Sequence, residues 1–204
     1  KALKETFASK VKDGSKAEAA VVVLSADGAV RAMIGGRDDK VSGVFNRATQ
    51  AKRQTGSSFK PFVFAAGLDQ GMTPDSIVQD GPLTINIKGG KPWSPQNYTR
   101  RFSGDVTMTT ALKQSLNTAT IRIQEKAGRD SVRRIAQEFG VGADLPNVPS
   151  LGLGVFDSTL LEMTGAYAGI LNGGSSVKPY GLVSLQLQGE EAELIGQDGG
   201  IGER

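Results

Sequence analysis

The first third of the chain alternates short apolar runs with turn residues. Helical spacing of its apolar positions predicts a helix over residues 1–12. Residues 18–23 and 29–34 have the composition of two strands. The turn between them ends in Gly28, which accepts the positive φ that tight turns need, so we expect a hairpin.

Residues 57–70 carry the strongest helical signal. Pro61 lies in the first turn, where a missing backbone N–H is tolerated, and Gly71 ends the segment. Beyond Lys60 the segment is apolar almost all round, which predicts a helix buried at the centre of a domain.

The remaining elements place a helical middle between strands. We expect helices over 107–114, 118–127, 130–139 and 158–171, a loop-rich segment over 72–105, and a strand over 178–187. This order predicts an α/β fold in which strands within 18–36 and 178–188 share one antiparallel sheet. Residues from about 57 to 172 form a helical lobe, and we expect the active cleft between the lobe and the sheet.

Composition removes several classes of chemistry. The 204 residues include no Cys and no His, so thiol nucleophiles, Ser-His-Asp triads and Cys or His metal sites are excluded, and we expect no cofactor. The net charge of +3 comes without a dense basic face, which argues against nucleic acid as a partner. The longest apolar run, residues 19–24, is too short to cross a bilayer.

Ser57 and Lys60 form the sharpest chemical signal. Three residues apart at a helix start, they lie on one face, and burial lowers the pKa of a lysine so that it can act as a base toward a serine. Ser-x-x-Lys is expected about once by chance in this composition, and it occurs three times. Ser9/Lys12 belongs to a solvated terminal helix and Ser175/Lys178 leads into a strand, so only Ser57/Lys60 opens a buried helix.

Ser115 and Asn117 form a second signal in a short break between two predicted helices. A hydroxyl and an amide two residues apart can point into one cleft, where one relays a proton and the other holds a carbonyl. Ser and Asn are also ordinary helix caps, so both interpretations stay open from this motif alone.

Five strings of the sequence, in order, resemble the transpeptidase domain of class A (bifunctional, 1A-type) penicillin-binding proteins. They are FNRATQAKRQTGSSFKPFVFAAGL, WSPQNY, TTALKQSLNTATIRI, PSLGLGVFDSTLLEMTGAYAGILNGG and VKPYGLV. The resemblance runs from about residue 19 to residue 187 and implies the fold shared by these proteins and the serine β-lactamases. It implies a D,D-transpeptidase that cross-links peptidoglycan through a serine acyl-enzyme.

The resemblance also implies roles for individual residues. Ser57 matches the nucleophile, with its backbone N–H in the oxyanion hole, Lys60 the general base, Ser115 the proton-relay serine and Asn117 the substrate-contacting amide. Trp93, Asn97 and Tyr98 match a string beside the cleft, where they anchor a loop or line the substrate groove. Residues 150–154 match a backbone turn near the site, and Phe59 and Phe62 match packing positions.

No Lys-Thr-Gly string occurs in the sequence, although the resemblance places one on a strand after residue 204. We therefore expect a truncated transpeptidase domain, impaired on its own, whose parent continues beyond this strand and carries an N-terminal membrane anchor. The implied partners are peptidoglycan stem peptides and β-lactams, at the outer face of a bacterial cytoplasmic membrane.

Three alternatives remain. A serine β-lactamase needs a Glu-activated water, but no Glu-x-x-x-Asn follows Asn117, and Glu162 lies in a helix that looks structural. A penicillin-sensing domain would not usually carry the quoted strings. A non-catalytic scaffold derived from the enzyme is compatible with the absent Lys-Thr-Gly string.

Overall fold

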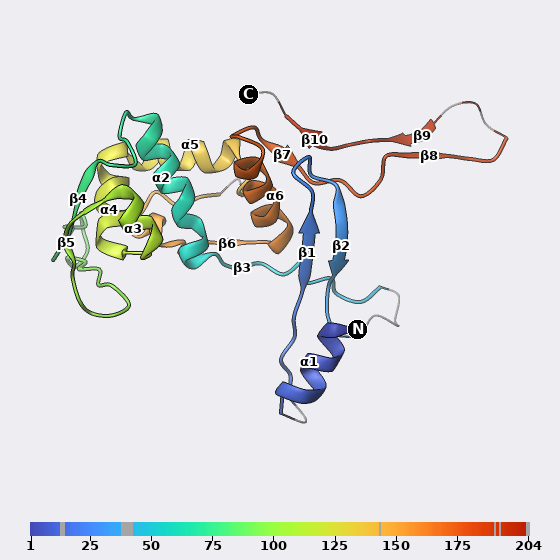
Figure 1. Ribbon diagram of the computed structural model, residues 1–204, viewed down its shortest axis with the longest axis horizontal. Helices are drawn as coiled ribbons and strands as arrows, with labels where there is room; N and C mark the ends of the chain where they lie inside the picture. Colours follow the sequence, from blue (N-terminus) through green and yellow to red (C-terminus); the bar gives the residue numbers. More distant parts are fainter. Residues whose placement is uncertain (13–14, 38–42, 143, 190, 192, 203–204) are drawn as a thin grey trace. The chain divides into compact units, whose positions relative to one another are not determined.

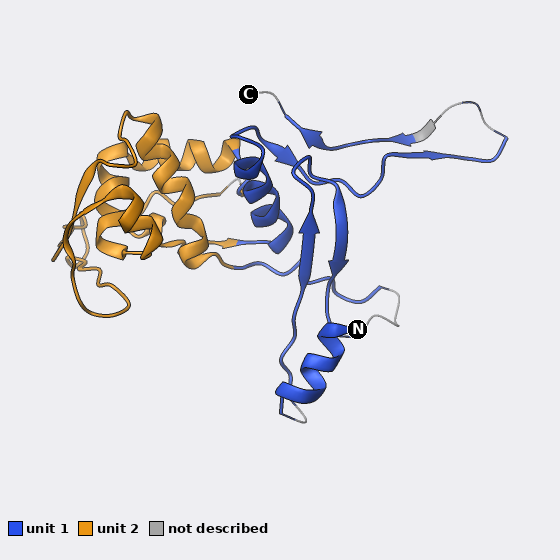
Figure 2. Cartoon of the chain, in the orientation of Figure 1, with its two compact units in different colours: residues 1–53, 139–141, 158–204 blue, residues 54–138, 142–157 orange. Residues whose placement is uncertain are grey.

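The computed structural model describes residues 1–12, 15–37, 43–142, 144–189, 191 and 193–202. The chain divides into two compact units (Figure 2). Unit 1 contains residues 1–53, 139–141 and 158–204, and unit 2 contains residues 54–138 and 142–157. The predicted lobe of about 57–172 differs from unit 2, because the helix before residue 172 packs with the strands of unit 1.

Unit 2 is mostly helical (Figure 1). Its elements are η1 (Gly56–Phe59), α2 (Lys60–Asp69), β4 (Ile77–Asp80), β5 (Gly104–Thr107), α3 (Met108–Lys113), α4 (Asn117–Ala127), α5 (Arg129–Glu138) and η2 (Leu151–Leu153). Helix α2 packs against α3, α4 and α5, as its predicted burial requires. Phe62 and Val63 of α2 and Ile121 and Ile123 of α4 are fully buried, so this helix pair forms the centre of the unit's core.

Unit 1 pairs its strands in short ladders. Its elements are α1 (Ala2–Lys10), β1 (Val21–Leu24), β2 (Val30–Ile34), α6 (Leu160–Leu171), β7 (Val177–Lys178), β8 (Ser184–Gln186), β9 (Glu193–Gly196) and β10 (Gly200–Ile201). Strands β1 and β2 form the predicted antiparallel hairpin, and α6 packs against β1. Two further short strands, β3 (Arg53–Gln54) and β6 (Asp157–Ser158), pair with each other.

The expected single sheet is replaced by separate two-stranded ladders among the described residues. The predicted strand over 178–187 breaks after β7, because Pro179 lacks the N–H that a ladder needs and a bend follows before β8. A bridge between Ala29 and Tyr180 joins this break to the hairpin, with Val30 N–H donating to Tyr180 O at 2.8 Å.

Two helices begin at other residues than the sequence predicts. The segment expected as one helix from Ser57 begins as the 3-10 turn η1, and α6 begins after Thr159 rather than at Ser158. Thr159 and Glu162 form a capping box, in which each side chain accepts from the other residue's backbone N–H. Glu162 therefore has the structural role expected of it.

The hairpin turn yields a test of packing. Gly28 has φ +93°, and a Cβ there would lie 2.7 Å from Val177 Cγ1, whereas Gly174, at φ +105°, faces open space. Both alanine variants bear backbone strain, and overpacking makes Gly28→Ala about 1–3 kcal/mol less stable than Gly174→Ala. Urea unfolding measures the difference, and equal losses would contradict this packing.

Candidate active site

The turn η1 places Ser57 and Lys60 on the same side of the chain, because residues three apart eclipse in a 3-10 helix. Ser57 is exposed, whereas Lys60, the first residue of α2, is 1% exposed. Phe59 between them is fully buried, with its ring 5.6 Å from that of Phe62 and 4.7 Å edge-on from that of Phe156. These rings fix η1 to the core while leaving the serine at the surface.

The Lys60 side chain ends among three acceptors. Its Nζ lies 2.6 Å from Ser115 O, 2.9 Å from Ser115 Oγ and 2.6 Å from Asn117 Oδ1. An ammonium group has three N–H bonds, so each one finds a partner. The structure thereby brings three of the four predicted catalytic side chains into direct contact.

Burial lowers the pKa of Lys60 to about 8. At pH 7 about a tenth of the molecules then hold the neutral amine. Two of the three partners, Ser115 O and Asn117 Oδ1, can only accept, so they retain the two remaining N–H bonds. The lone pair then faces Ser115 Oγ, the one partner that can donate a proton.

The break between α3 and α4 turns Ser115 toward the lysine. Ser115 has φ +54°, a left-handed conformation that is uncommon outside glycine. Its N–H and that of Leu116 close the end of α3 on Leu112 O and Ala111 O. This turn presents both oxygens of Ser115 to Lys60, and α4 begins at once with Asn117.

Asn117 divides its amide between two partners. Its Oδ1 accepts from Lys60, and its Nδ2 donates to Gln96 O at 2.8 Å. The sequence left open whether Ser115 and Asn117 are ordinary helix caps. The structure does not support that interpretation, because neither side chain caps α4.

The Ser57 hydroxyl is the one predicted catalytic group that is not hydrogen-bonded to Lys60. Among the described residues, no hydrogen bond joins its Oγ to Lys60 Nζ or to any other group. Catalytic hydrogen bonds are often long before a substrate is bound. The Ser57 side chain is therefore free to meet a ligand.

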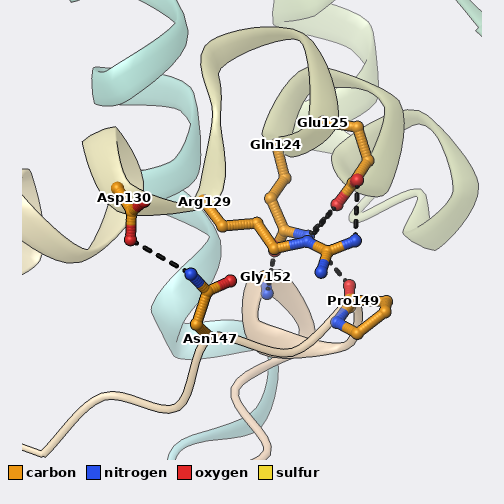
Figure 3. A network of polar contacts seen from close by, with 7 residues as sticks. All are labelled: Gln124, Glu125, Arg129, Asp130, Asn147, Pro149 and Gly152. Atoms are coloured by element: carbon orange, nitrogen blue, oxygen red, sulfur yellow. Dashed lines mark hydrogen bonds and ion pairs between the residues drawn. The ribbon is translucent and has the colours of Figure 1, made fainter. Parts of the chain in front are cut away.

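The loop of residues 149–156 packs against η1. Gly154 O accepts from Gly56 N–H at 3.0 Å, next to Ser57. The loop is held in turn by buried Gln124, whose Nε2 donates to Pro149 O at 2.8 Å and whose Oε1 accepts from Gly152 N–H at 2.6 Å (Figure 3). Gly154, at φ +67°, presses so closely on Gly56 that a Cβ would overlap the backbone there. Residues 150–154 thus form the expected turn.

The three residues of the WSPQNY string take different positions. Trp93 is half-buried and exchanges backbone hydrogen bonds with Ile85, and Tyr98 is 99% exposed. Asn97 is 5% exposed, and its amide is used entirely by the protein. Asn97 is therefore an anchor, and its interpretation as a residue that lines the substrate groove is not supported by this geometry.

The other two Ser-x-x-Lys pairs are separated by their contexts. Lys12 lies beyond the end of α1, and Ser9 is exposed. Lys178 pairs with Asp198 at 2.6 Å, while Ser175 is buried. Within the described ranges, no cluster of carboxylates suits a metal ion, and no helix is both long and apolar enough to cross a membrane.

The site combines a serine on a short turn, a lysine with a depressed pKa one turn further on, and a Ser-x-Asn element in contact with that lysine. This combination is typical of serine acyl-transferases that use lysine in place of histidine. The penicillin-binding protein transpeptidase domain matches residues 19–192. The chain therefore belongs to the penicillin-binding protein transpeptidase family.

Individual relatives agree with this assignment. Penicillin-binding protein 1A of Rickettsia conorii is 39% identical over 181 residues, which cover 88% of this chain and 22% of that protein. The crystal structure of penicillin-binding protein 1A from Haemophilus influenzae superposes with a TM-score of 0.80 at 38% identity, covering 89% of this chain and 27% of that chain. The chain spans about a fifth of the length of the curated relatives it matches.

PonA1 from Mycobacterium tuberculosis in complex with penicillin V superposes with a TM-score of 0.73 at 30% identity, covering 88% of this chain and 50% of that chain. These structures support the expected α/β fold of the family.

The depressed pKa of Lys60 can be measured directly. In ¹³C NMR of protein carrying ε-¹³C-lysine, the Lys60 signal, assigned by its absence in Lys60→Met, titrates with a midpoint near 8. Since the unfolded chain binds the extra proton up to about 10.5, stability also rises with pH between these values. A Lys60 midpoint near 10.5 would contradict the burial argument.

Proposed function

We propose that this chain provides the acyl-transfer site of a peptidoglycan D,D-transpeptidase. The observation that carries the proposal is the buried Lys60 amine, in contact with both Ser115 and Asn117 one turn after an exposed serine. The substrate class is a stem peptide ending in D-Ala-D-Ala, and β-lactams acylate the same serine.

The proposed steps follow from which groups of the site can donate a proton and which can accept one. Ser57 Oγ attacks the carbonyl of the penultimate D-Ala, and its proton passes to neutral Lys60, directly or through Ser115 Oγ. The Ser57 N–H stabilises the developing oxyanion. The amide C–N bond then breaks, and the leaving D-Ala nitrogen takes a proton from the Lys60 ammonium by way of Ser115.

Asn117 has the further task of holding the peptide. Its Nδ2, now on Gln96 O, is the group of this side chain that can donate to a substrate carbonyl, while its Oδ1 keeps Lys60 in place. An amine of a second stem peptide then attacks the ester carbonyl and gives a proton to neutral Lys60. The ester C–O bond breaks, and Ser57 Oγ takes the proton back from the Lys60 ammonium.

Several whole-protein features belong to the same proposal. The location is the extracytoplasmic face of a bacterial inner membrane, because the substrate lies there, and the membrane is reached through an N-terminal anchor. A strand with Lys-Thr-Gly after residue 204 supplies the second oxyanion donor, whose loss costs about 10²–10³ in rate.

A serine β-lactamase is not favoured. It would need a carboxylate free to activate a water, and Glu162 Oε2 already accepts from Thr159 N–H and from the Ser158 hydroxyl, both at 2.8 Å. A non-catalytic scaffold remains the outcome to be tested against the enzyme.

The nucleophile can be tested with a neighbouring serine as control. We expect Ser57→Ala to abolish the penicillin adduct seen by intact-protein mass spectrometry, since the hydroxyl is the group acylated. Ser58→Ala should keep the adduct, although Ser58 lies in the same turn and its Oγ donates to Thr55 O at 2.6 Å.

The experiment is run on the 204-residue chain and on the longest polypeptide that its gene encodes. An adduct in the longer form alone supports an incomplete site in the shorter one. Persistence of the adduct in Ser57→Ala would reject the assignment of the nucleophile, and no adduct in either form would favour the scaffold.

A further inference from the structure

A buried carboxylate lies at the start of α4, behind the active-site residues. Asp80, the last residue of β4, is 0% exposed, and within the described part of the chain it has no cationic partner. Its oxygens accept from Asn97 Nδ2 at 2.8 and 2.9 Å, from Ser103 N–H at 2.8 Å and from the Thr118 hydroxyl. Burial raises its pKa, but these donors outweigh burial and hold the pKa below the usual value, so the group stays ionised.

The carboxylate determines which way the Asn97 amide points. An ionised carboxylate only accepts, so it binds the Asn97 NH₂ group and repels the carbonyl end. The second N–H of that group goes to Arg101 O at 2.9 Å. The only remaining group, Asn97 Oδ1, faces the first turn of α4.

Asn97 Oδ1 meets the backbone of the catalytic segment there. It accepts from Asn117 N–H at 2.7 Å and lies 3.4 Å from Thr118 N. Both groups belong to the first turn of α4, whose N–H groups have no partner inside the helix. A cap on Asn117 N–H fixes the residue whose side chain holds Lys60.

We propose that Asp80 and Asn97 are positioning residues for acyl transfer, because their oriented pair sets the Asn117 amide against Lys60. The inference rests on the function proposed above and adds two residues that touch neither Ser57 nor Lys60. The proposal also explains why position 80 holds a carboxylate. An amide at this position could both donate and accept, so it would not determine which end of the Asn97 amide faces α4.

Exchange of the two side chains tests the pair. Asn97→Asp sets two carboxylates against each other, and we expect the rate of acylation by penicillin to fall about 100-fold, as misplaced catalytic groups cause. Asp80→Asn alone should cost about tenfold. The double variant restores one donor facing one acceptor and leaves an acceptor for Asn117 N–H, but it does not restore the hydrogen bond to Arg101 O. Its rate should therefore recover to within about tenfold of the unsubstituted protein rather than completely.

Thr118→Val serves as the control for loss of a buried hydrogen bond to Asp80, since the Asn97 amide and the Ser103 N–H still donate to the carboxylate. We expect it to lose stability, as any buried polar deletion does, while its acylation rate stays within about threefold. The proposal would be overturned if the acylation rate of the double variant fell by the product of the two single-variant losses. It would also be overturned if Thr118→Val lowered the rate as much as Asn97→Asp does. The longest encoded polypeptide is used throughout.

A second readout does not depend on acylation. In Asn97→Ala the uncapped Asn117 no longer holds its Oδ1 against Lys60, so the NMR titration midpoint of Lys60 falls below that of the unsubstituted protein. An unchanged midpoint in a folded Asn97→Ala protein would reject the positioning role. If the unsubstituted protein forms no adduct, the proposed function fails, and this titration still decides the role of Asn97.

Discussion

Burial of the Lys60 amine is the constraint on which the rest of the site depends. An ammonium removed from water must find partners for all its N–H bonds, and here the partners are supplied by one short break between α3 and α4. The same burial that makes the charge costly lowers the pKa to about 8, as the proposed role of Lys60 as a base requires. The proposed chemistry therefore relies on the same contacts that satisfy the buried amine.

The surrounding structure fixes the positions of η1 and of the start of α4. Phe59 anchors η1 to the core, Gly154 presses against Gly56, and Gln124 holds the loop that carries Gly154. At the other side, Asp80 and Asn97 fix the start of α4. Each of these groups is buried and fully hydrogen-bonded or tightly packed, as a site that must be held to a fraction of an ångström requires.

The sequence predicted the helices well because their apolar spacing is strong. It indicated Ser57, Lys60, Ser115 and Asn117 as candidates because the proposed chemistry needs those residue types at short spacing. It placed a continuous strand over 178–187, where tertiary contacts and Pro179 dictate a break. It also extended the helical lobe to 172, although α6 packs with β1.

Asp80 and Gln124 were missed because single polar residues carry no spacing pattern. Their importance arises from partners far along the chain, such as Thr118 for Asp80 and Gly152 for Gln124. For Asn97 the family string was visible, but its buried position became clear only from the contacts of its amide.

The pH dependence of the acylation rate tests the central claim most directly, because in the proposed mechanism only the neutral Lys60 amine can take the serine proton. With penicillin in excess, the account predicts a rate that rises about tenfold per pH unit below the pKa and levels off above about 8. A rate that stays constant from about pH 6 to 9 would contradict the claim that the deprotonated lysine is the base.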